Sequence, residues 1–397
     1  MPTRKKICVL LSRFPYPIDK GDKLRAYHQL QYLSRYADIH LITLSHHKVS
    51  ESDKQAIAAY CTSIEIYYLH TFNTVWQSIL SFFRAQPIQV GYFYSAQIRK
   101  QIHQQLHTLK PDLIYCQLTR TALYAIDLPY PKIIDLQDAF SLNYSRIVSH
   151  SKGFYRWFYQ RESARMAAFE SHVIDHFDKA TIISQQDKMA LKADKEKVTI
   201  VSNGIDTDYY SPQPIERNYE LLFLGNLSYL PNRKAVEYIL HELCPLLSAQ
   251  FPNIKITIAG ADTPSHYLAM QHPHVSFTGW VDDTRSVYSR AHVFIAPLFA
   301  GAGLQNKLLE AMSMGLPCVA TSVVNASLQA TPDREILIAD KASDFVQHIS
   351  RLLNDAALYH SVSLASRSFV EQNYPWEQVN QELLQVVWPY IAPASQQ

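Results

Sequence analysis

Short apolar runs alternate with helix-like amphipathic stretches along the chain, and this alternation restarts once after a stretch of turn residues and prolines. The predicted strands are residues 7–11, 39–44, 64–69, 113–116, 132–136, 180–184, 198–202, 220–224, 254–259, 275–278, 293–296, 318–320 and 336–338. The predicted helices include residues 24–36, 76–83, 98–109, 155–177, 235–247, 284–289, 306–314, 342–354 and 358–372. Strands that alternate with helices predict parallel sheets covered on both faces. We therefore expect an α/β chain with two doubly wound, Rossmann-like domains.

The restart of the pattern gives the domain boundaries. Asn203-Gly204 is a turn signal, and the prolines at 212 and 214 follow it before the next apolar run. We assign residues 1–202 to a first domain, 203–217 to a linker and 218–373 to a second domain. The remaining residues, 374–397, form an apolar helix that we expect to pack away from its own domain. Ligands of two such facing domains bind at the carboxyl ends of the strands.

Length and composition exclude several classes of protein. A chain of 397 residues with 47% hydrophobic and 18% charged residues is typical of a soluble globular protein. The five cysteines are scattered and read as buried thiols of a reducing compartment, without metal or redox spacing. The first apolar run is too short for a signal peptide, and no window is long and apolar enough to span a bilayer. We therefore expect a cytoplasmic protein.

Charge is divided unevenly between the two halves. Residues 1–205 hold 26 Lys and Arg against 17 Asp and Glu, a net of +9, whereas residues 206–397 hold 11 against 18, a net of −7. This asymmetry predicts that the first half meets an anionic membrane surface, a phosphorylated lipid or an acidic sugar. Attraction between the halves is the alternative. An aromatic stripe over 67–94 fits a membrane interface, although such stripes also form cores.

Residues 294–321 place a strand, a glycine loop, a helix start and another strand in series. Gly301 and Gly303 let a ligand approach the backbone, and the free N–H groups of the helix start favour anionic oxygens. Glu310 lies one turn into that helix, where its carboxylate can accept hydrogen bonds from vicinal sugar hydroxyls. The alternative is that Glu310 only complements the helix dipole and the glycines only turn the chain.

The loop after the first strand is a second candidate site. Gly21 permits close approach, Asp22 is a candidate helix cap, and Lys20, Lys23 and Arg25 bring positive charge to a diphosphate or an acceptor. A solvated basic face is the alternative.

Strand ends of the second domain supply further candidates. Helix starts suit phosphate, and the backbone after a strand can hold the edge of a base. Simple turns are the alternative. The residues are Gly225, Asn226, Asn232, Arg233, Gly260, Gly279 and Trp280.

Two pairs of aspartates are candidates for a chemical role. Asp206 and Asp208 spell the DxD pattern of metal sites, but they lie in the linker, so we do not assign a metal to them. Asp135 and Asp138 follow a predicted strand, and one of them can act on an acceptor hydroxyl or hold the donor sugar. Capping of the backbone at 141–144 is the alternative.

Together, these residues resemble glycosyltransferase family 4 of the GT-B fold. The matching segments are NGID at 203–206, Gly260, HVSFTGWVD at 274–282, Pro297 and LEAMSMGLPCVAT at 309–321. Three further segments resemble glycosyltransferases associated with exosortase and exopolysaccharide loci, namely PYPIDKGDKLR at 15–25, GNLSYLPN at 225–232 and QNKLLEA at 305–311.

The resemblance implies a nucleotide-diphosphate sugar on the second domain, an acceptor on the first, and metal-independent transfer with retention at the anomeric carbon. It implies that the terminal helix near Trp376 crosses back to the first domain. It places Glu310 on the ribose hydroxyls and the helix start near the donor. That helix start comprises Gly303, Leu304, Gln305, Asn306 and Lys307.

This chain also departs from the family pattern. Ala302 stands where the family has a second Glu, and Asn226 and Asn232 stand where it has the cations that hold the diphosphate. A buried anion still needs positive charge. We hypothesise that Lys307 and Arg233, with Lys20 or Arg25, supply it.

The resulting prediction is a cytoplasmic retaining glycosyltransferase that acts on a glycan or lipid-linked glycan, with an anionic membrane surface as a further candidate partner. Asp138, Lys307 and Glu310 are the predicted catalytic residues. We expect no cofactor besides the nucleotide sugar as substrate, no metal and no nucleic acid partner. The alternatives are a sugar-nucleotide epimerase or phosphorylase on the same scaffold, and a non-catalytic scaffold of an envelope complex.

Overall fold

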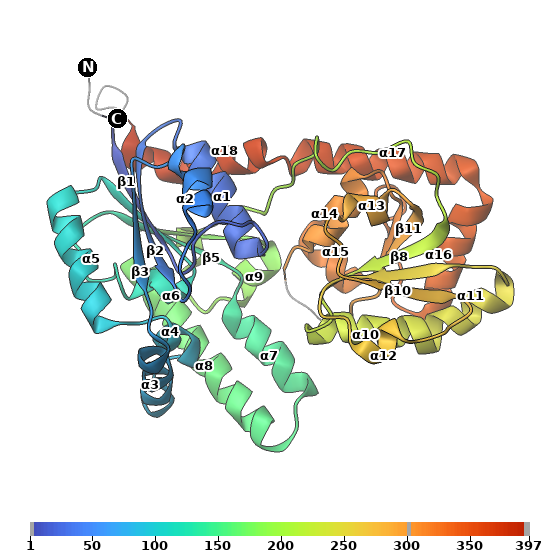
Figure 1. The fold of residues 1–397 in the computed structure, drawn as a ribbon, viewed down its shortest axis with the longest axis horizontal. Coiled ribbons are helices and arrows are strands. Elements are labelled where there is room, and N and C mark those ends of the chain that lie inside the picture. The colour runs from blue at the N-terminus through green and yellow to red at the C-terminus, as the bar shows by residue number, and fades with distance from the viewer. Residues whose placement is uncertain (1–3, 300–302, 393–397) are drawn as a thin grey trace. The chain divides into compact units, whose positions relative to one another are not determined.

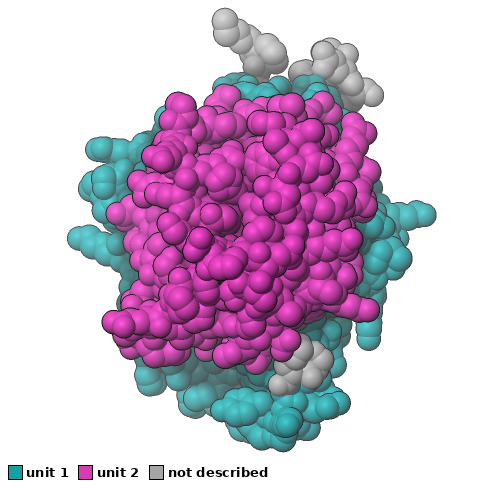
Figure 2. Space-filling model, turned by 90° about the vertical axis from the view of Figure 1, so that its right-hand side faces the viewer, with its two compact units in different colours: residues 1–202, 377–397 teal, residues 203–376 magenta. Residues whose placement is uncertain are grey.

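The computed structural model describes residues 4–299 and 303–392, and the chain divides into two compact units. Unit 1 comprises residues 1–202 and 377–397, and unit 2 comprises residues 203–376 (Figures 1 and 2). Gly301 and Ala302, two residues of the predicted glycine loop, lie outside the described residues.

Unit 1 contains a seven-stranded parallel sheet in the order β3-β2-β1-β4-β5-β6-β7. The strand order reverses between β1 and β4, as in a doubly wound sheet. The strands are β1 (Lys6–Leu11), β2 (Asp38–Ser45), β3 (Ser63–Tyr68), β4 (Leu113–Gln117), β5 (Lys132–Gln137), β6 (Lys179–Ile182) and β7 (Val198–Ile200).

Helices cover both faces of this sheet (Figure 1). Side chains of β1 alternate between two cores, with Cys8 and Leu10 in one and Ile7, Val9 and Leu11 in the other. The helices are α1 (Gly21–Leu33), α2 (Glu51–Ala58), α3 (Thr71–Phe83), α4 (Ile88–Tyr92), α5 (Ala96–Leu109), α6 (Thr119–Ala122), α7 (Phe140–His150), α8 (Gly153–His176), α9 (Gln185–Ala190) and α18 (Trp376–Ile391), with a 3-10 turn η1 (Lys195–Lys197).

The last helix, α18, packs on the sheet of unit 1. Its apolar side chains Val379, Leu383 and Val387 join the core formed by β1 and α1. Asn380 Nδ2 donates a hydrogen bond to the carbonyl of His28 at 3.3 Å, and Figure 1 shows α18 passing one end of α1. The terminal helix, which was expected to cross back to the first domain, thus packs on unit 1.

Unit 2 contains a six-stranded parallel sheet in the order β10-β9-β8-β11-β12-β13. Its order reverses between β8 and β11. The strands are β8 (Tyr219–Leu224), β9 (Ile256–Ala259), β10 (Val275–Gly279), β11 (Ala291–Ala296), β12 (Cys318–Ala320) and β13 (Leu337–Ile338). The helices are α10 (Leu230–Tyr238), α11 (Cys244–Gln250), α12 (Ser265–Leu268), α13 (Arg285–Tyr288), α14 (Asn306–Ser313), α15 (Ser322–Leu328), α16 (Ala342–Asn354) and α17 (Ala356–Asn373), with a π-helical turn η2 (Ile239–Leu243).

The expectation of two doubly wound α/β domains is confirmed, but some predicted elements differ. The single helix expected over 235–247 is α10, η2 and α11 in series. Pro245 has no N–H and its ring crowds the preceding turn, so the chain widens into a π turn before it. The sequence also missed α7, which follows β5.

None of the helices in the described part of the chain is both long and apolar enough to cross a bilayer. The five cysteines are unpaired, and Cys61 is the least buried of them.

Candidate functional site

The candidate donor site lies in unit 2 at the carboxyl ends of β8, β9 and β11. β8 and β11 flank the reversal of strand order, where doubly wound sheets bind ligands because the loops diverge there. Gly225 follows β8, Gly260 follows β9, and the loop after β11 leads to α14.

Two glycines bring these loops into close contact. Gly260 has a φ of +145°, and a Cβ on it would lie 2.0 Å from the carbonyl oxygen of Gly225. A Cβ on Gly225 would lie 2.8 Å from Asn232 Nδ2 and 2.9 Å from Lys307 Nζ. Both glycines therefore make room for neighbouring protein atoms.

Lys307, in the first turn of α14, reaches across to α10. Its Nζ donates a 2.7 Å hydrogen bond to Asn232 Oδ1 and lies 5.0 Å from the centre of the Phe223 ring. Burial lowers the pKa of Lys307 to about 7, and the charge of Glu310 opposes this shift. The ammonium group thus lies beside the end of β8, where it donates to the amide oxygen of Asn232 and faces the aromatic ring of Phe223.

The two asparagines bind each other and the neighbouring loop. Asn232 Nδ2 donates to the carbonyl of Asn226 at 2.7 Å, and Asn226 Nδ2 donates to Asp262 Oδ2 at 2.9 Å. Asn226 Oδ1 accepts hydrogen bonds from the N–H and the hydroxyl of Ser228. Both side chains therefore hold the loops together and orient Lys307.

Glu310 is partly exposed and is anchored at one oxygen. The hydroxyl of Tyr288 lies 2.9 Å from Glu310 Oε2 and 3.1 Å from the carbonyl oxygen of Lys307. Burial raises the pKa of Glu310, whereas the hydrogen bond from Tyr288 and the charge of Lys307 oppose the rise. Anchoring at one oxygen orients the carboxylate and leaves the other as an acceptor for hydroxyl groups.

The start of α14 is tied to the segment that follows unit 1 in the sequence. Asn306 Oδ1 accepts a 3.3 Å hydrogen bond from Asn203 Nδ2, and Gln305 Nε2 donates to the carbonyl of Gly303 at 3.4 Å. Gly303 has a φ of +71°, and Leu304 packs on the core of unit 2. These contacts fix the direction in which the first N–H groups of α14 point.

The other predicted donor residues lie at the periphery. Arg233 is exposed on α10. Trp280 is 68% exposed, and its Nε1 donates a 2.8 Å hydrogen bond to Asp282. Gly279, with a φ of +72°, accepts a hydrogen bond from the N–H of Gly260. Gly279 therefore positions the loop that contains Gly260.

Arg25 is not part of an open anion site, which corrects the prediction. Its side chain is buried, with Nε 2.7 Å from Asp135 Oδ2 and Nη2 3.1 Å from Oδ1. The carbonyls of Val201 and Ser202 accept its other N–H groups. The carboxylate of Asp135 also accepts a hydrogen bond from the hydroxyl of Thr181. Both of its oxygens are therefore occupied inside the protein, and we no longer regard Asp135 as a candidate for binding the acceptor or the donor sugar.

Asp138 remains a candidate for proton transfer. It is half-buried just after β5, and burial together with the charge of Asp187 raises its pKa to about 7. The backbone at Ser141, which Asp138 was expected to cap as an alternative, is held by Glu170. A carboxyl that titrates near neutrality suits general acid–base chemistry.

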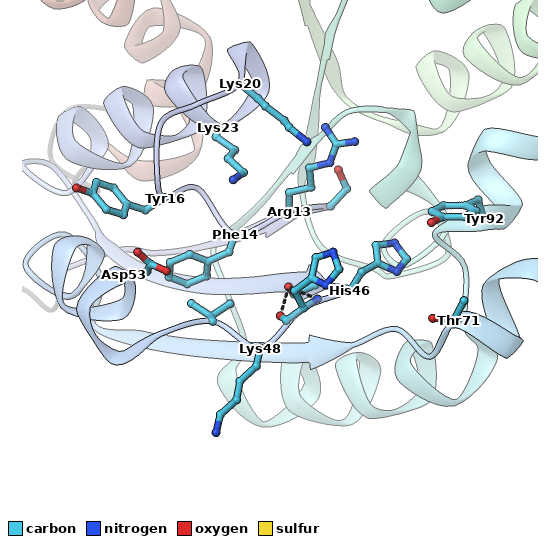
Figure 3. Close-up of a pocket in the computed structure, with 14 residues that line it drawn as sticks. Arg13, Phe14, Tyr16, Lys20, Lys23, His46, Lys48, Asp53, Thr71 and Tyr92 are labelled. Atoms are coloured by element: carbon cyan, nitrogen blue, oxygen red, sulfur yellow. Dashed lines mark hydrogen bonds between the residues drawn. The ribbon is translucent and has the colours of Figure 1, made fainter. Parts of the chain in front are cut away.

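The loop after β1 lines a pocket of about 470 Å³ in unit 1 (Figure 3). Lys20 and Lys23 line it, and Gly21 begins α1 with no atom within 4 Å of the position of an added Cβ. Asp22 was expected to cap α1, but it lies inside the first turn and its carboxylate pairs with Arg13 at 3.0 Å. The pocket also receives His46 and His47 from the loop after β2.

Several of these residues were missed by sequence reasoning. Tyr288 was part of a predicted helix, and nothing in its spacing showed that its hydroxyl reaches Glu310. His46 and His47 lie two and three residues after the strand predicted at 39–44, so the rule that ligands bind at strand ends could have found them.

The DxD pair caps a turn. Asp206 Oδ1 accepts hydrogen bonds from the N–H groups of Asp208 at 3.1 Å and Tyr209 at 2.9 Å. Within residues 4–299 and 303–392, no three His, Cys, Asp or Glu side chains gather as ligands for a metal ion.

A match to a known protein family lies within unit 2. Residues 218–355 match the family model described as glycosyl transferases group 1. Unit 2 carries a glycosyltransferase group 1 domain. The matched span contains Gly225, Asn232, Gly260, Lys307 and Glu310, so the whole hydrogen-bonded cluster around Lys307 belongs to this domain.

The likeness extends over the whole chain. An uncharacterized 44.6 kDa protein in the cps region of Klebsiella pneumoniae is 22% identical over 395 residues, covering 94% of this chain and 97% of that protein. Anabaena HepE in complex with UDP has a TM-score of 0.69 and 14% identity, covering 97% of this chain and all of HepE (100%). Sucrose-phosphate synthase from Thermosynechococcus elongatus has a TM-score of 0.70 at 14% identity, covering 98% of this chain and 100% of that one. At these identities the structural likeness establishes the fold, which is GT-B.

Proposed function

We propose that this chain is a retaining glycosyltransferase that moves a sugar from a nucleotide diphosphate to a glycan or lipid-linked glycan in exopolysaccharide or envelope biosynthesis. The observation that carries the proposal is the placement of Lys307 and Glu310 one turn apart on α14, at the strand reversal of the group 1 domain. The relative in a cps region fits a polysaccharide locus.

In this proposal, Lys307 and Glu310 bind different parts of the nucleotide sugar. The free oxygen of Glu310 accepts hydrogen bonds from the ribose hydroxyls, while Tyr288 holds the other oxygen. Lys307 binds the diphosphate and replaces the cations absent at Asn226 and Asn232. Since Asn232 is a neutral acceptor, an anion can displace it from Lys307 at little electrostatic cost.

The proposed chemistry breaks the bond between the anomeric carbon and the leaving diphosphate and forms a bond from the acceptor oxygen to that carbon on the same face, which retains the configuration. Negative charge develops on the diphosphate, so Lys307 and the first N–H groups of α14 stabilise the transition state. Asp138, with its pKa raised to about 7 by burial and Asp187, takes up the acceptor proton. The proposal requires neither a metal nor a further cofactor.

A screen of nucleotide sugars tests this function. The full chain is mixed with UDP-, GDP-, ADP- and CMP-sugars, and thermal unfolding is followed. UDP-sugars come first, because HepE was solved with UDP. We expect at least one to raise the melting temperature, and that rise to be lost in Lys307→Met but kept in the exposed Lys234→Met. A folded chain that binds none of them would instead favour a scaffold.

Labelled donor then separates the enzymes that share this fold. Transfer with retention gives a product whose anomeric configuration, read from NMR coupling constants, matches that of the donor. Conversion of the donor without an acceptor would identify an epimerase, and a requirement for inorganic phosphate would identify a phosphorylase.

We also propose that unit 1 docks on the cytoplasmic face of an anionic membrane. An exposed surface of α3 and the start of α8, here the α3–α8 surface, consists of Phe72, Val75, Trp76, Ile79, Phe83, Phe154, Tyr155 and Trp157. Phe72 and Phe83 are 80% and 77% exposed, and the rings of Phe82 and Trp157 join the two helices at 6.5 Å. Figure 1 places α3 and the start of α8 at one end of unit 1.

The charges beside the α3–α8 surface favour an anionic lipid partner. Residues 71–92 and 140–161 contain no Asp or Glu, and their basic residues are Arg84, Arg146, Lys152, Arg156 and Arg161. Aromatic side chains bordered by cations suit the interface of anionic bilayers.

Vesicle binding at low salt tests the membrane proposal. We expect sedimentation with phosphatidylglycerol vesicles but not with phosphatidylcholine vesicles, and loss of binding in Phe83→Ser/Phe154→Ser. Leu364→Ser, which changes an exposed leucine of unit 2, serves as the control. Equal binding to neutral and anionic vesicles would contradict the proposal.

A further inference from the structure

The pocket of unit 1 collects positive charge at the carboxyl ends of β1 and β2. Its lining residues include Arg13, Lys20, Lys23 and Lys48, with His46 and His47, against the single carboxylate of Asp53. Figure 3 shows Arg13, Lys20 and Lys23 on one side of the pocket and His46 across from them, while Lys48 points away.

The carboxylates that balance two of these cations do not line the pocket. Arg13 pairs with Asp22 at 3.0 Å, and Lys23 pairs with Asp19 at 2.8 Å. Within residues 4–299 and 303–392, Lys20 has no acidic partner within ion-pairing distance. The pairs hold the cations in place, and their open sides face the pocket.

His46 leaves a polar atom without a partner at this site. Its Nε2 is buried, and no hydrogen-bonding group lies within reach of it in the described residues. The imidazole lies 5.0 Å from the ring of Tyr92 and 5.5 Å from that of Phe93. A buried ring nitrogen without a partner costs free energy unless a ligand or water meets it.

We propose that this pocket binds the phosphate or diphosphate group of the acceptor, so that the acceptor is a phosphorylated sugar or a glycan linked to lipid through phosphate. Arg13, Lys20 and Lys23 neutralise the anion, and His46 Nε2 hydrogen-bonds to it. This inference rests on the proposed function for the identity of the ligand as the acceptor.

The size and walls of the pocket fit more than an anion. A volume of about 470 Å³ exceeds that of a phosphate group, and Phe14, Tyr16 and Tyr92 supply aromatic walls against which a sugar ring can pack. Several converging cations favour the multiple charge of a phosphate or diphosphate over the single charge of a sugar carboxylate.

Nuclear magnetic resonance of the His46 imidazole reports on this pocket directly. Inorganic pyrophosphate is titrated into the full chain carrying Lys307→Met, which removes the proposed phosphate contact of unit 2. The His46 signals are assigned by their loss in His46→Gln. We expect them to shift and saturate with pyrophosphate, and to stay unmoved with sodium glucuronate at equal concentration and ionic strength.

Matched variants locate the cations that bind. We expect Lys20→Ala and Lys23→Ala each to weaken pyrophosphate binding about tenfold, as loss of one charge-assisted hydrogen bond does. Lys54→Ala, whose exposed side chain pairs with Glu51 on α2, should leave binding unchanged. Circular dichroism confirms that each variant is folded.

Two further ligands separate the sources of the phosphate. A response of His46 to glucose 1-phosphate identifies a soluble phosphosugar as the ligand. A response to vesicles containing phosphatidic acid but not to glucose 1-phosphate identifies a lipid phosphate. Each result supports the anion site. No shift with pyrophosphate, or equal affinity in Lys20→Ala and the parent, would overturn it. A shift of His46 in a chain that binds no nucleotide sugar would leave this site standing and reject the proposed transferase.

Discussion

The ammonium of Lys307 on α14 donates a 2.7 Å hydrogen bond to Asn232 Oδ1 on α10. This bond joins the starts of two helices at the point where the strand order of unit 2 reverses. It holds a cation beside Gly225, which follows β8: a Cβ at Gly225 would lie 2.9 Å from Lys307 Nζ. The positive charge that is absent at Asn232 is thereby supplied by Lys307.

Replacement of Lys307 should weaken donor binding. We expect Lys307→Met to lower the affinity for a nucleotide-diphosphate sugar about tenfold to a hundredfold, since a hydrogen bond to a charged group contributes about 1.5–3 kcal/mol. Isothermal titration calorimetry measures the change. The matched control is Lys234→Met, because Lys234 is exposed on α10 and pairs with Glu237. An unchanged dissociation constant in Lys307→Met would remove Lys307 from the site.

Donor binding should also depend on pH through Lys307. Burial lowers the pKa of Lys307 to about 7, so much of the side chain is neutral above that pH in the free protein. A diphosphate stabilises the charged form, so binding takes up a proton and affinity falls by up to about tenfold per pH unit above 7. Calorimetry at pH 8 in two buffers of different ionisation enthalpy measures the uptake. Lys307→Arg, which stays charged, should lose both effects, and a pH-independent affinity in the parent would contradict the prediction.

Glu310 should accept hydrogen bonds from the ribose hydroxyls of the donor. We expect Glu310→Ala to weaken binding of a nucleoside diphosphate about tenfold or more, because two hydroxyl groups lose a charged acceptor. A 2′,3′-dideoxynucleotide should bind the parent and Glu310→Ala equally, since it lacks the groups that Glu310 contacts. Comparing both proteins with both nucleotides distinguishes the loss of a direct contact at Glu310 from a general loss of structure. Tyr288→Phe, which frees Glu310 Oε2, should give an intermediate loss.

Arg25 and Asp135 should matter for the stability of unit 1. We expect Arg25→Met to destabilise this unit by about 3–5 kcal/mol, because it leaves a buried carboxylate without its partner. Hydrogen exchange read by mass spectrometry should show lost protection in peptides from β1, β5 and α1 but not in those of unit 2. Lys54→Met at an exposed pair should change protection little. Full protection in Arg25→Met would show that the pair is not structurally required.

Two glycines offer a matched test of loop packing. Gly260→Ala should destabilise unit 2 by about 1–3 kcal/mol, because its φ is +145° and the added Cβ would lie 2.0 Å from the carbonyl oxygen of Gly225. Gly21→Ala should be nearly neutral, since nothing lies within 4 Å of its added Cβ. Hydrogen exchange of β8 and β9 measures the difference. Equal protection in the two variants would mean that the loop after β9 relaxes freely.

Hydrophobic periodicity by itself determined the two doubly wound sheets and each of the strands β1 to β13, because a short apolar run between helical patterns is a local feature of the sequence. The same holds for Glu310 and Lys307, whose place one turn into a helix follows from their distance to the glycine loop. Tertiary structure alone decided which polar groups meet. Arg25 and Asp135 are 110 residues apart and pair inside unit 1, whereas Lys307 and Asn232 are 75 apart and pair in unit 2. It also decided that His46 faces Lys20 across a pocket and that α18 completes the core of unit 1. Side chains of parallel strands and their loops converge only after the strands are ordered in the sheet, and that order depends on contacts between distant segments.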